Sequence, residues 1–191
     1  MSNFSKVNDA TIRLWARVLR SIEDSHLLLL VPEGSPRDRV TRLLQVEGIG
    51  AERVAYAGKL PRPEYLALHH RIDLGLDTLP YNGHTTSLDA YWMGVPIVTL
   101  VGQTVAGRAG WSQLSNLGLT GLAAQTPDEF VRVATNLARD LPRLAALRAE
   151  LRGRMERSPL MDAPRFARHI EAAYRAMWRQ WCESARRGDR V

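Results

Sequence analysis

The chain has 191 residues, of which 45% are apolar and 24% are charged, so it is long enough for one compact domain with a hydrophobic core. No apolar run approaches the roughly 20 residues of a membrane-spanning helix, and the N-terminal residues have neither the basic nor the apolar region of a secretion signal. Cys182 is the only cysteine, which excludes an intrachain disulfide and a zinc site built on several cysteines. We therefore expect a single cytoplasmic domain without membrane contact.

The formal net charge of +6 permits binding to nucleic acid or another polyanion. Nearly all of the basic residues are arginines, however, and they are spread along the expected helices. No helix-turn-helix signature, aromatic stacking platform or zinc module accompanies them. We interpret the charge as belonging to solvated helix faces and expect no nucleic-acid partner, with a basic nucleic-acid-binding domain as the less favoured alternative.

Four short apolar runs are each followed by turn residues and then by a helical pattern; they lie at residues 26–31, 54–58, 72–76 and 96–101. This alternation predicts a parallel sheet, and the nearly continuous apolar character predicts that helices cover both of its faces. Only helical patterns follow the fourth run, at residues 108–117, 127–140, 142–157 and 164–183. We expect no further strand. The predicted fold is α/β, an open doubly wound parallel sheet of Rossmann-like type with C-terminal helices.

The segment after the third apolar run is the most informative for function. A loop at residues 77–83 ends in Gly83 and leads into a helical pattern that begins at His84. Open parallel sheets bind ligands at such loops, beyond the carboxyl end of a strand. Gly83 lets a ligand approach the backbone closely, and the first amides of the helix have no partner within it. With the helix dipole and the hydroxyls of Thr85 and Thr86, these amides form a candidate phosphate-binding site.

Two further side chains complete the expected site. His84 adds a ring-nitrogen donor, and Asp89, about one helical turn further on, offers a carboxylate to ribose hydroxyls. The alternative is that Thr85 and Thr86 only cap a helix and that Asp89 is a solvent-exposed carboxylate. Capping needs only one of these residues, so the combination favours a nucleotide site.

A metal site is not expected. The adjacent residues His69 and His70 would point about 100° apart on a helix, and no third ligand lies at a useful spacing, so we assign both to a helix surface. Asp73 and Asp77 do not form a compact acidic metal-binding motif. We expect Asp73 to begin a strand and Asp77 to brace the loop that follows it.

These residues resemble glycosyltransferase family 41, which includes the protein O-linked N-acetylglucosamine transferases and the SPINDLY proteins. The resemblance runs nearly end to end and is most specific at residues 82–89. It also rests on the segments at residues 3–6, 14–19, 77–92, 94–96, 107–108 and 158–160. Members of this family are metal-independent inverting enzymes of the GT-B type, with two Rossmann-like domains of which the second binds most of the donor. The chain resembles that second domain, the C-terminal catalytic half.

The resemblance assigns a role to each matching residue. His84, Thr85 and Thr86 would bind the donor diphosphate, and Asp89 would bind the ribose. Lys6 matches the family lysine beside the phosphates. Lys6 and His84 would act in catalysis, because they could stabilise the negative charge that grows on the departing diphosphate.

Further donor-binding residues are implied at the base and the sugar. Asn3 stands where the family has an amide side chain near the phosphates. Leu60, Arg62 and Tyr65 fall on the loop that holds the uracil, where Arg62 replaces a lysine and Tyr65 replaces a histidine of the animal members. Tyr81 replaces a small residue that lies near the sugar.

The resemblance also implies a domain organisation. Residues 1–160 would form the nucleotide-sugar-binding domain, residues 161–185 the C-terminal helix of the GT-B fold, and residues 186–191 a disordered tail. The family's first catalytic domain, and the tetratricopeptide repeats that usually precede it, are expected partners that this chain lacks. We therefore expect the isolated chain to be inactive.

The implied activity is transfer of a sugar to a serine or threonine of an acceptor protein. The expected donor is UDP-N-acetylglucosamine, and no metal or other cofactor is required. A non-catalytic nucleotide-binding module is the alternative, since the residues that suggest a phosphate site do not by themselves require catalysis.

Overall fold

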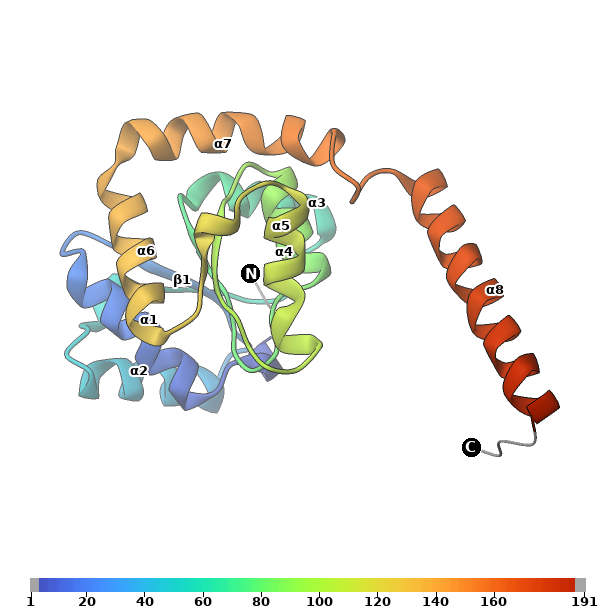
Figure 1. Ribbon diagram of the computed structural model, residues 1–191. Helices are drawn as coiled ribbons and strands as arrows, with labels where there is room; N and C mark the ends of the chain where they lie inside the picture. The colour runs from blue at the N-terminus through green and yellow to red at the C-terminus, as the bar shows by residue number, and fades with distance from the viewer. Residues whose placement is uncertain (1–3, 188–191) are drawn as a thin grey trace.

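The computed structural model describes residues 4–187 and has a parallel β-sheet in two parts, flanked by helices (Figure 1). One part pairs β1 (Leu27–Leu30) with β2 (Val54–Ala57). The other has the order β3-β4-β5, formed by Gly75–Leu76, Ile97–Leu100 and Ala123–Ala124. The four predicted strands are therefore confirmed, in shorter form, and the predicted α/β class with them.

The expectation that no strand follows residue 101 is wrong. Strand β5 pairs in parallel with the end of β4, where Thr99 and Leu100 lie opposite Ala123 and Ala124. It has only two residues, and neither is the β-branched or aromatic type that marks a strand in a sequence. Two alanines therefore do not indicate a strand in the sequence. They form one here because they pair with β4.

Helices connect the strands and follow the last of them. They are α1 (Asp9–Ser21), α2 (Ser35–Val46), α3 (Arg62–Leu68), α4 (Thr85–Trp92), α5 (Ala109–Asn116), α6 (Pro127–Arg139), α7 (Leu141–Glu156) and α8 (Ala163–Arg187). The helices predicted after the last apolar run are confirmed as α5 to α8. Helix α6 begins as its sequence predicts, with Pro127 in the first turn and the Thr126 hydroxyl accepting a hydrogen bond from the Glu129 amide at 3.2 Å.

The core lies between the sheet and the helices, which pack in two groups. Figure 1 shows α1, α2 and α6 on one side of the body and α3, α4 and α5 on the other, with α7 running across one end. Each group contributes side chains that are completely buried. They include Ile12, Leu44, Tyr91 and Phe130, and α7 contributes Leu151.

Helix α8 differs from the others, because it projects from the body and buries no residue (Figure 1). It includes Arg186 and Arg187, the first two residues of the expected tail, while residues 188–191 lie outside the described part of the chain. No helix within residues 4–187 is both long enough and apolar enough to cross a membrane.

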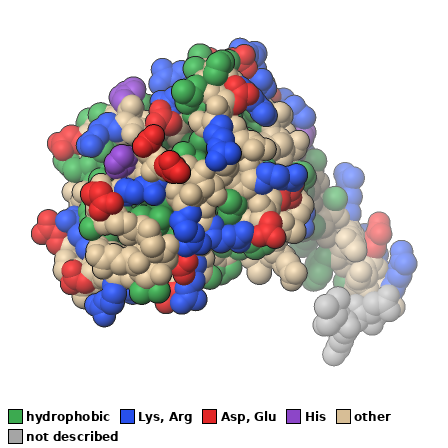
Figure 2. All heavy atoms as spheres, turned by 90° about the vertical axis from the view of Figure 1, so that its left-hand side faces the viewer, with side chains coloured by type: hydrophobic (Ala, Val, Ile, Leu, Met, Phe, Trp, Pro, Cys, Tyr) green, Lys and Arg blue, Asp and Glu red, His purple; other side chains and the backbone are tan. Residues whose placement is uncertain are grey.

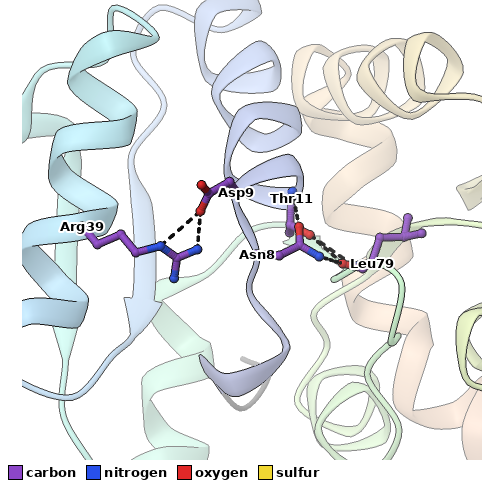
Figure 3. Close-up of polar contacts among 5 residues, drawn as sticks. All are labelled: Asn8, Asp9, Thr11, Arg39 and Leu79. Carbon is purple, nitrogen blue, oxygen red and sulfur yellow. Dashed lines mark hydrogen bonds and ion pairs between the residues drawn. The ribbon is translucent and has the colours of Figure 1, made fainter.

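The start of α1 is fixed to the loop after β3 (Figure 3). The Asn8 side chain accepts a hydrogen bond from the Thr11 amide at 2.8 Å, which caps the helix, and also donates one to the Leu79 carbonyl at 2.6 Å. The Thr11 hydroxyl donates to the same carbonyl at 2.9 Å. An ion pair between Asp9 and Arg39 joins the same turn of α1 to α2. Helix α1 and the segment before it are thereby held against loop 77–83.

Basic and acidic side chains are mixed on the face formed by α1, α2 and α6 (Figure 2). Ion pairs join several of them, including Arg17–Asp128, Arg20–Glu47 and Arg39–Asp9. On this face the arginines lie among carboxylates and do not form a continuous basic surface.

Phe130 of α6 tests the core assignment. We expect Phe130→Ala to lower the free energy of unfolding by about 3–5 kcal/mol, because it leaves a cavity among buried side chains. Phe166 of α8 is the matched control: it is 65% exposed, so Phe166→Ala should change stability by less than about 0.5 kcal/mol. Urea denaturation measures both, and equal losses in the two variants would contradict the assignment.

Candidate functional site

The loop that follows β3 is organised around the buried carboxylate of Asp77. Its Oδ1 accepts hydrogen bonds from the amides of Thr78 at 2.8 Å and Gly83 at 2.7 Å, and its Oδ2 accepts one from the Thr99 hydroxyl at 2.7 Å. Burial raises the pKa of Asp77, and these hydrogen bonds lower it again in part. The carboxylate joins both ends of loop 77–83 to β4, which confirms its predicted role as a brace.

Two amide side chains hold the second half of this loop. The Asn82 Oδ1 accepts a hydrogen bond from the Gly110 amide at 3.3 Å, and Gln113 donates to the carbonyls of Gly83 at 3.4 Å and His84 at 3.2 Å. Neither role was predicted. The Asn-Gly pair at residues 82–83 indicates a turn, whereas no local pattern around Gln113 indicates contact with a loop about 30 residues away.

Helix α5 reaches the loop because of Gly110. A Cβ atom at this position would lie 2.8 Å from Oδ2 of Asp77 and closer still to the Thr99 hydroxyl. Only glycine therefore allows the backbone of α5 to pack so close to the carboxylate and its partner.

Helix α4 begins at the surface of the protein. His84 is the residue before the helix, and within residues 4–187 no side chain caps it and no acidic residue lies in its first turn. His84 and Thr85 are exposed, and Thr86 is half-buried. The interpretation in which Thr85 and Thr86 only cap the helix is wrong, because they lie inside its first turn. The helix therefore has its positive end at the surface, and among residues 4–187 no side chain accepts a hydrogen bond from the amides of its first turn.

Lys6 reaches the start of α4 from the other end of the sequence. It ends a 3₁₀ turn, Phe4–Lys6, and its Nζ donates to the Asn82 carbonyl at 3.1 Å. The same Nζ lies 4.0 Å from the centroid of the Tyr81 ring, and that ring lies 5.3 Å from the ring of His84. Burial lowers the pKa of Lys6. The Lys6 ammonium and the His84 imidazole thus both lie against the Tyr81 ring, next to the start of α4.

Asp89 lies further along α4 and is engaged by α3. The Arg62 guanidinium donates to both carboxylate oxygens, at 2.7 Å and 2.6 Å. The Asp89 side chain is 12% exposed, and that of Arg62 is 60% exposed. The Arg62 guanidinium also lies 5.5 Å from the Tyr65 ring, and burial raises the pKa of Tyr65 to about 12. The ion pair of Arg62 and Asp89 therefore joins α3, where the base is expected to bind, to α4, where the phosphates are expected to bind.

The other predicted residues have different outcomes. Leu60 is half-buried in the loop before α3, and Asn3 lies outside the described residues. The assignment of His69 to a helix surface is wrong, whereas His70 is exposed as expected. Where α3 ends, a 3₁₀ turn directs His69 inward, with its Nδ1 3.1 Å from the Tyr65 carbonyl and its ring edge-on to the Tyr65 ring.

A parallel α/β fold with a helix start beyond the carboxyl end of a strand defines a domain of the doubly wound class, in which ligands commonly bind at this edge of the sheet. The family model described as Glycosyl transferase family 41 matches residues 1–170 of the chain. The chain therefore belongs to glycosyltransferase family 41, as the resemblance of residues 82–89 predicts.

Two curated relatives illustrate the similarity. A probable UDP-N-acetylglucosamine--peptide N-acetylglucosaminyltransferase SPINDLY from Solanum lycopersicum is 36% identical over 186 residues, which are 95% of this chain and 20% of that protein. The UDP-N-acetylglucosamine--peptide N-acetylglucosaminyltransferase of Caenorhabditis elegans is 29% identical over 176 residues, which are 92% of this chain and 15% of that protein. The chain thus spans a fifth or less of the length of these relatives.

Among solved structures, a mutant of the O-GlcNAc transferase from Thermobaculum terrenum has the same fold. The two match with a TM-score of 0.90 and 39% sequence identity, over 97% of this chain and 36% of that chain. This match confirms the predicted α/β fold with C-terminal helices.

The hydrogen bonds of Asp77 can be tested with two substitutions. Asp77→Ala leaves the amides of Thr78 and Gly83 without an acceptor, and each unsatisfied buried group costs about 1–3 kcal/mol. Asp77→Asn keeps the oxygen that both amides use, and its amide group can donate to Thr99, so we expect a loss below about 1 kcal/mol. Thermal unfolding measures both; a loss of the same size in the two variants would argue against the brace.

Proposed function

We propose that the chain is the donor-binding part of an inverting glycosyltransferase, which transfers a sugar from a nucleoside diphosphate to a serine or threonine of an acceptor protein. The names of the relatives support this, since they describe transfer of N-acetylglucosamine from its UDP derivative to peptides, and they favour UDP-N-acetylglucosamine as the donor. The observation that carries the proposal is the open start of α4 with the Lys6 ammonium beside it. The lone cysteine suits a reducing compartment, so we assign the protein to the cytoplasm.

In this proposal the donor diphosphate lies at the start of α4. The free amides of the first turn and the hydroxyls of Thr85 and Thr86 donate hydrogen bonds to its oxygens, and the helix dipole favours its negative charge. Lys6 and His84 approach from the side of the Tyr81 ring. The phosphates therefore meet donors from two segments that are remote in the sequence.

The same groups explain the chemistry. As the bond between the anomeric carbon and the diphosphate breaks, negative charge grows on the departing diphosphate. The Lys6 ammonium, the His84 ring and the α4 amides stabilise that charge, and the Asn82 carbonyl already holds the ammonium in place. Because these donors are fixed before the reaction, the leaving group needs no metal ion. Attack by the acceptor hydroxyl from the opposite side of the sugar inverts the anomeric carbon.

The nucleoside lies between α4 and α3. Asp89 offers its oxygens to the ribose hydroxyls, which must share the carboxylate with Arg62 or displace it. The Tyr65 ring offers a flat apolar face to the base, and Leu60 offers backbone groups that require no particular side chain. Tyr81, which is 45% exposed beside His84, faces the sugar end of the donor.

Calorimetric titration with UDP, GDP and their sugars tests the donor site. We expect the wild-type chain to bind UDP and its sugar, and Lys6→Ala and Asp89→Ala each to weaken binding about tenfold to a hundredfold, because each loses a charged hydrogen-bonding group. The controls Lys59→Ala and Asp73→Ala remove the same charges from exposed positions and should bind as the wild type does. A folded wild-type chain that binds none of these nucleotides would refute the proposal, and salt-sensitive nucleic-acid binding in its place would favour the basic-domain alternative.

We further propose that transfer requires the rest of the longer protein. The chain spans a fifth or less of its relatives, and in GT-B enzymes the first domain supplies much of the acceptor site. The isolated chain should therefore bind the donor without efficient turnover. If it shows no transfer even when joined to an upstream catalytic half, the alternative of a non-catalytic nucleotide-binding module is favoured.

Helix α8 offers the surface for this contact. Large apolar side chains are exposed along it at helical spacing: Phe166, Ile170, Tyr174, Met177, Trp178 and Trp181. The rings of Trp178 and Trp181 stack with their centroids 5.1 Å apart. The last helix of a GT-B enzyme commonly returns to the first domain, so we propose that this stripe packs on that domain in the longer protein.

Self-association of the isolated chain tests the stripe. We expect the chain to form oligomers through its exposed rings, and Trp178→Lys combined with Trp181→Lys to shift it towards monomer in sedimentation velocity. The unfolding midpoint should not fall, because α8 buries no residue. Gln180→Lys adds a charge to the same helix without removing a ring and should leave oligomers intact. Sedimentation of the double variant identical to that of wild type would contradict the prediction.

A further inference from the structure

The Arg62 side chain occupies both groups at which the nucleoside is proposed to bind. Its guanidinium donates to the two oxygens of Asp89, which are offered to the ribose hydroxyls. The same guanidinium lies 5.5 Å from the centroid of the Tyr65 ring, which is offered to the base. One planar side chain with several hydrogen-bond donors therefore makes the two contacts that a nucleoside would make.

The Asp89 carboxylate is not freely accessible while Arg62 is bound to it. The Asp89 side chain is only 12% exposed, and each of its oxygens already accepts a hydrogen bond from the guanidinium. Ribose hydroxyls have to donate to the same two oxygens. Because so little of the carboxylate is exposed beside the guanidinium, the ribose reaches it by replacing Arg62.

Arg62 itself is free to move away. It is the first residue of α3, its side chain is 60% exposed, and within residues 4–187 its only hydrogen bonds are those to Asp89. A long arginine side chain on the surface regains its hydration when it turns into the solvent. Its departure therefore breaks one ion pair and one ring contact and disturbs no other hydrogen bond.

The Tyr65 hydroxyl offers the carboxylate a replacement donor. Among residues 4–187 this buried hydroxyl has no hydrogen-bond partner. Burial and, after it, the negative charge of nearby Asp89 raise the pKa of Tyr65, which keeps the hydroxyl protonated as a donor. When the guanidinium leaves, the carboxylate can accept a hydrogen bond from this hydroxyl, so that neither group stays unpaired.

We propose that Arg62 is an internal competitor of the nucleoside: a nucleotide binds by displacing it from Asp89, and the Tyr65 hydroxyl then holds the carboxylate towards the ribose. This inference rests on the proposed donor site and concerns its nucleoside end. The apparent affinity for a nucleotide is then the intrinsic affinity reduced by the fraction of molecules in which Arg62 has left Asp89. A ligand that binds only at the start of α4 is unaffected by this competition.

Calorimetric titration of Arg62→Ala with UDP and with inorganic pyrophosphate tests the proposal. We expect UDP to bind about threefold to tenfold more tightly than to the wild type, because the competitor is gone. Pyrophosphate has neither ribose nor base and should bind within about twofold of the wild type. Arg42→Ala is the matched control, since it removes an exposed arginine from α2, on the opposite side of the body, and should leave both affinities unchanged.

Three further variants separate competition from a loss of structure. Arg62→Lys keeps the charge but cannot bond both oxygens in the same way, so its affinity for UDP should lie between those of the wild type and Arg62→Ala. In an Asp89→Ala background, Arg62→Ala should lose most of its effect, because no carboxylate is left to block. Tyr65→Phe keeps the ring and should weaken UDP about threefold without changing pyrophosphate binding.

The sign of the change in Arg62→Ala decides the matter. If the wild type binds UDP and Arg62→Ala binds it equally or more weakly, the guanidinium does not compete, and the proposal is overturned while the donor site stands. An equal gain for pyrophosphate also overturns it, because the effect would then not involve the nucleoside. If the wild type binds pyrophosphate but not UDP, the proposed function fails, and this inference fails with it.

Discussion

A buried carboxylate is costly unless hydrogen bonds replace the water that it loses, and Asp77 receives three of them. Two come from amides at opposite ends of the loop between β3 and α4, and the third comes from β4. The loop is therefore closed on itself before any ligand arrives. Because Gly83 is held by this carboxylate, α4 starts at a fixed point with its amides directed outward. The proposed phosphate-binding site therefore depends on a residue that would not contact the phosphate.

Helix α1 holds the same loop from its other side. The Trp15 indole donates to the Asp77 carbonyl at 3.2 Å, and Asn8 and Thr11 both donate to the Leu79 carbonyl. The segment that carries Lys6 runs directly into this helix. The ammonium and the amides therefore belong to one rigid unit, although the two ends of the site are far apart in the sequence.

Much of the fold and part of the arrangement at the candidate site could be predicted from the sequence, for physical reasons. Strands and helices with a clear apolar period were predicted, whereas β5 is two alanines and depends on the edge of β4. The α4 start was predicted because its glycine, threonines and carboxylate are neighbours in the chain. Lys6 required the family resemblance, since no local pattern links it to residue 82.

Two further features could not be predicted from the sequence, for a related reason. The pairing of Arg62 with Asp89 joins two helices whose relative position only the folded chain defines. Apolar periodicity likewise identifies strands but not their neighbours, so the interruption between β1 and β3 has no signature in the sequence.

Because α5 approaches loop 77–83 so closely at Gly110, a substitution at this glycine would disturb the candidate site from behind. A single added methyl group would press on the Thr99 hydroxyl and on the Asp77 carboxylate that it bonds. Either the helix must withdraw, taking Gln113 away from the carbonyls of Gly83 and His84, or the carboxylate must give up a partner. Substitution of this glycine would therefore disturb the proposed donor site as strongly as substitution of the residues proposed to contact the ligand, although the glycine itself lies behind them.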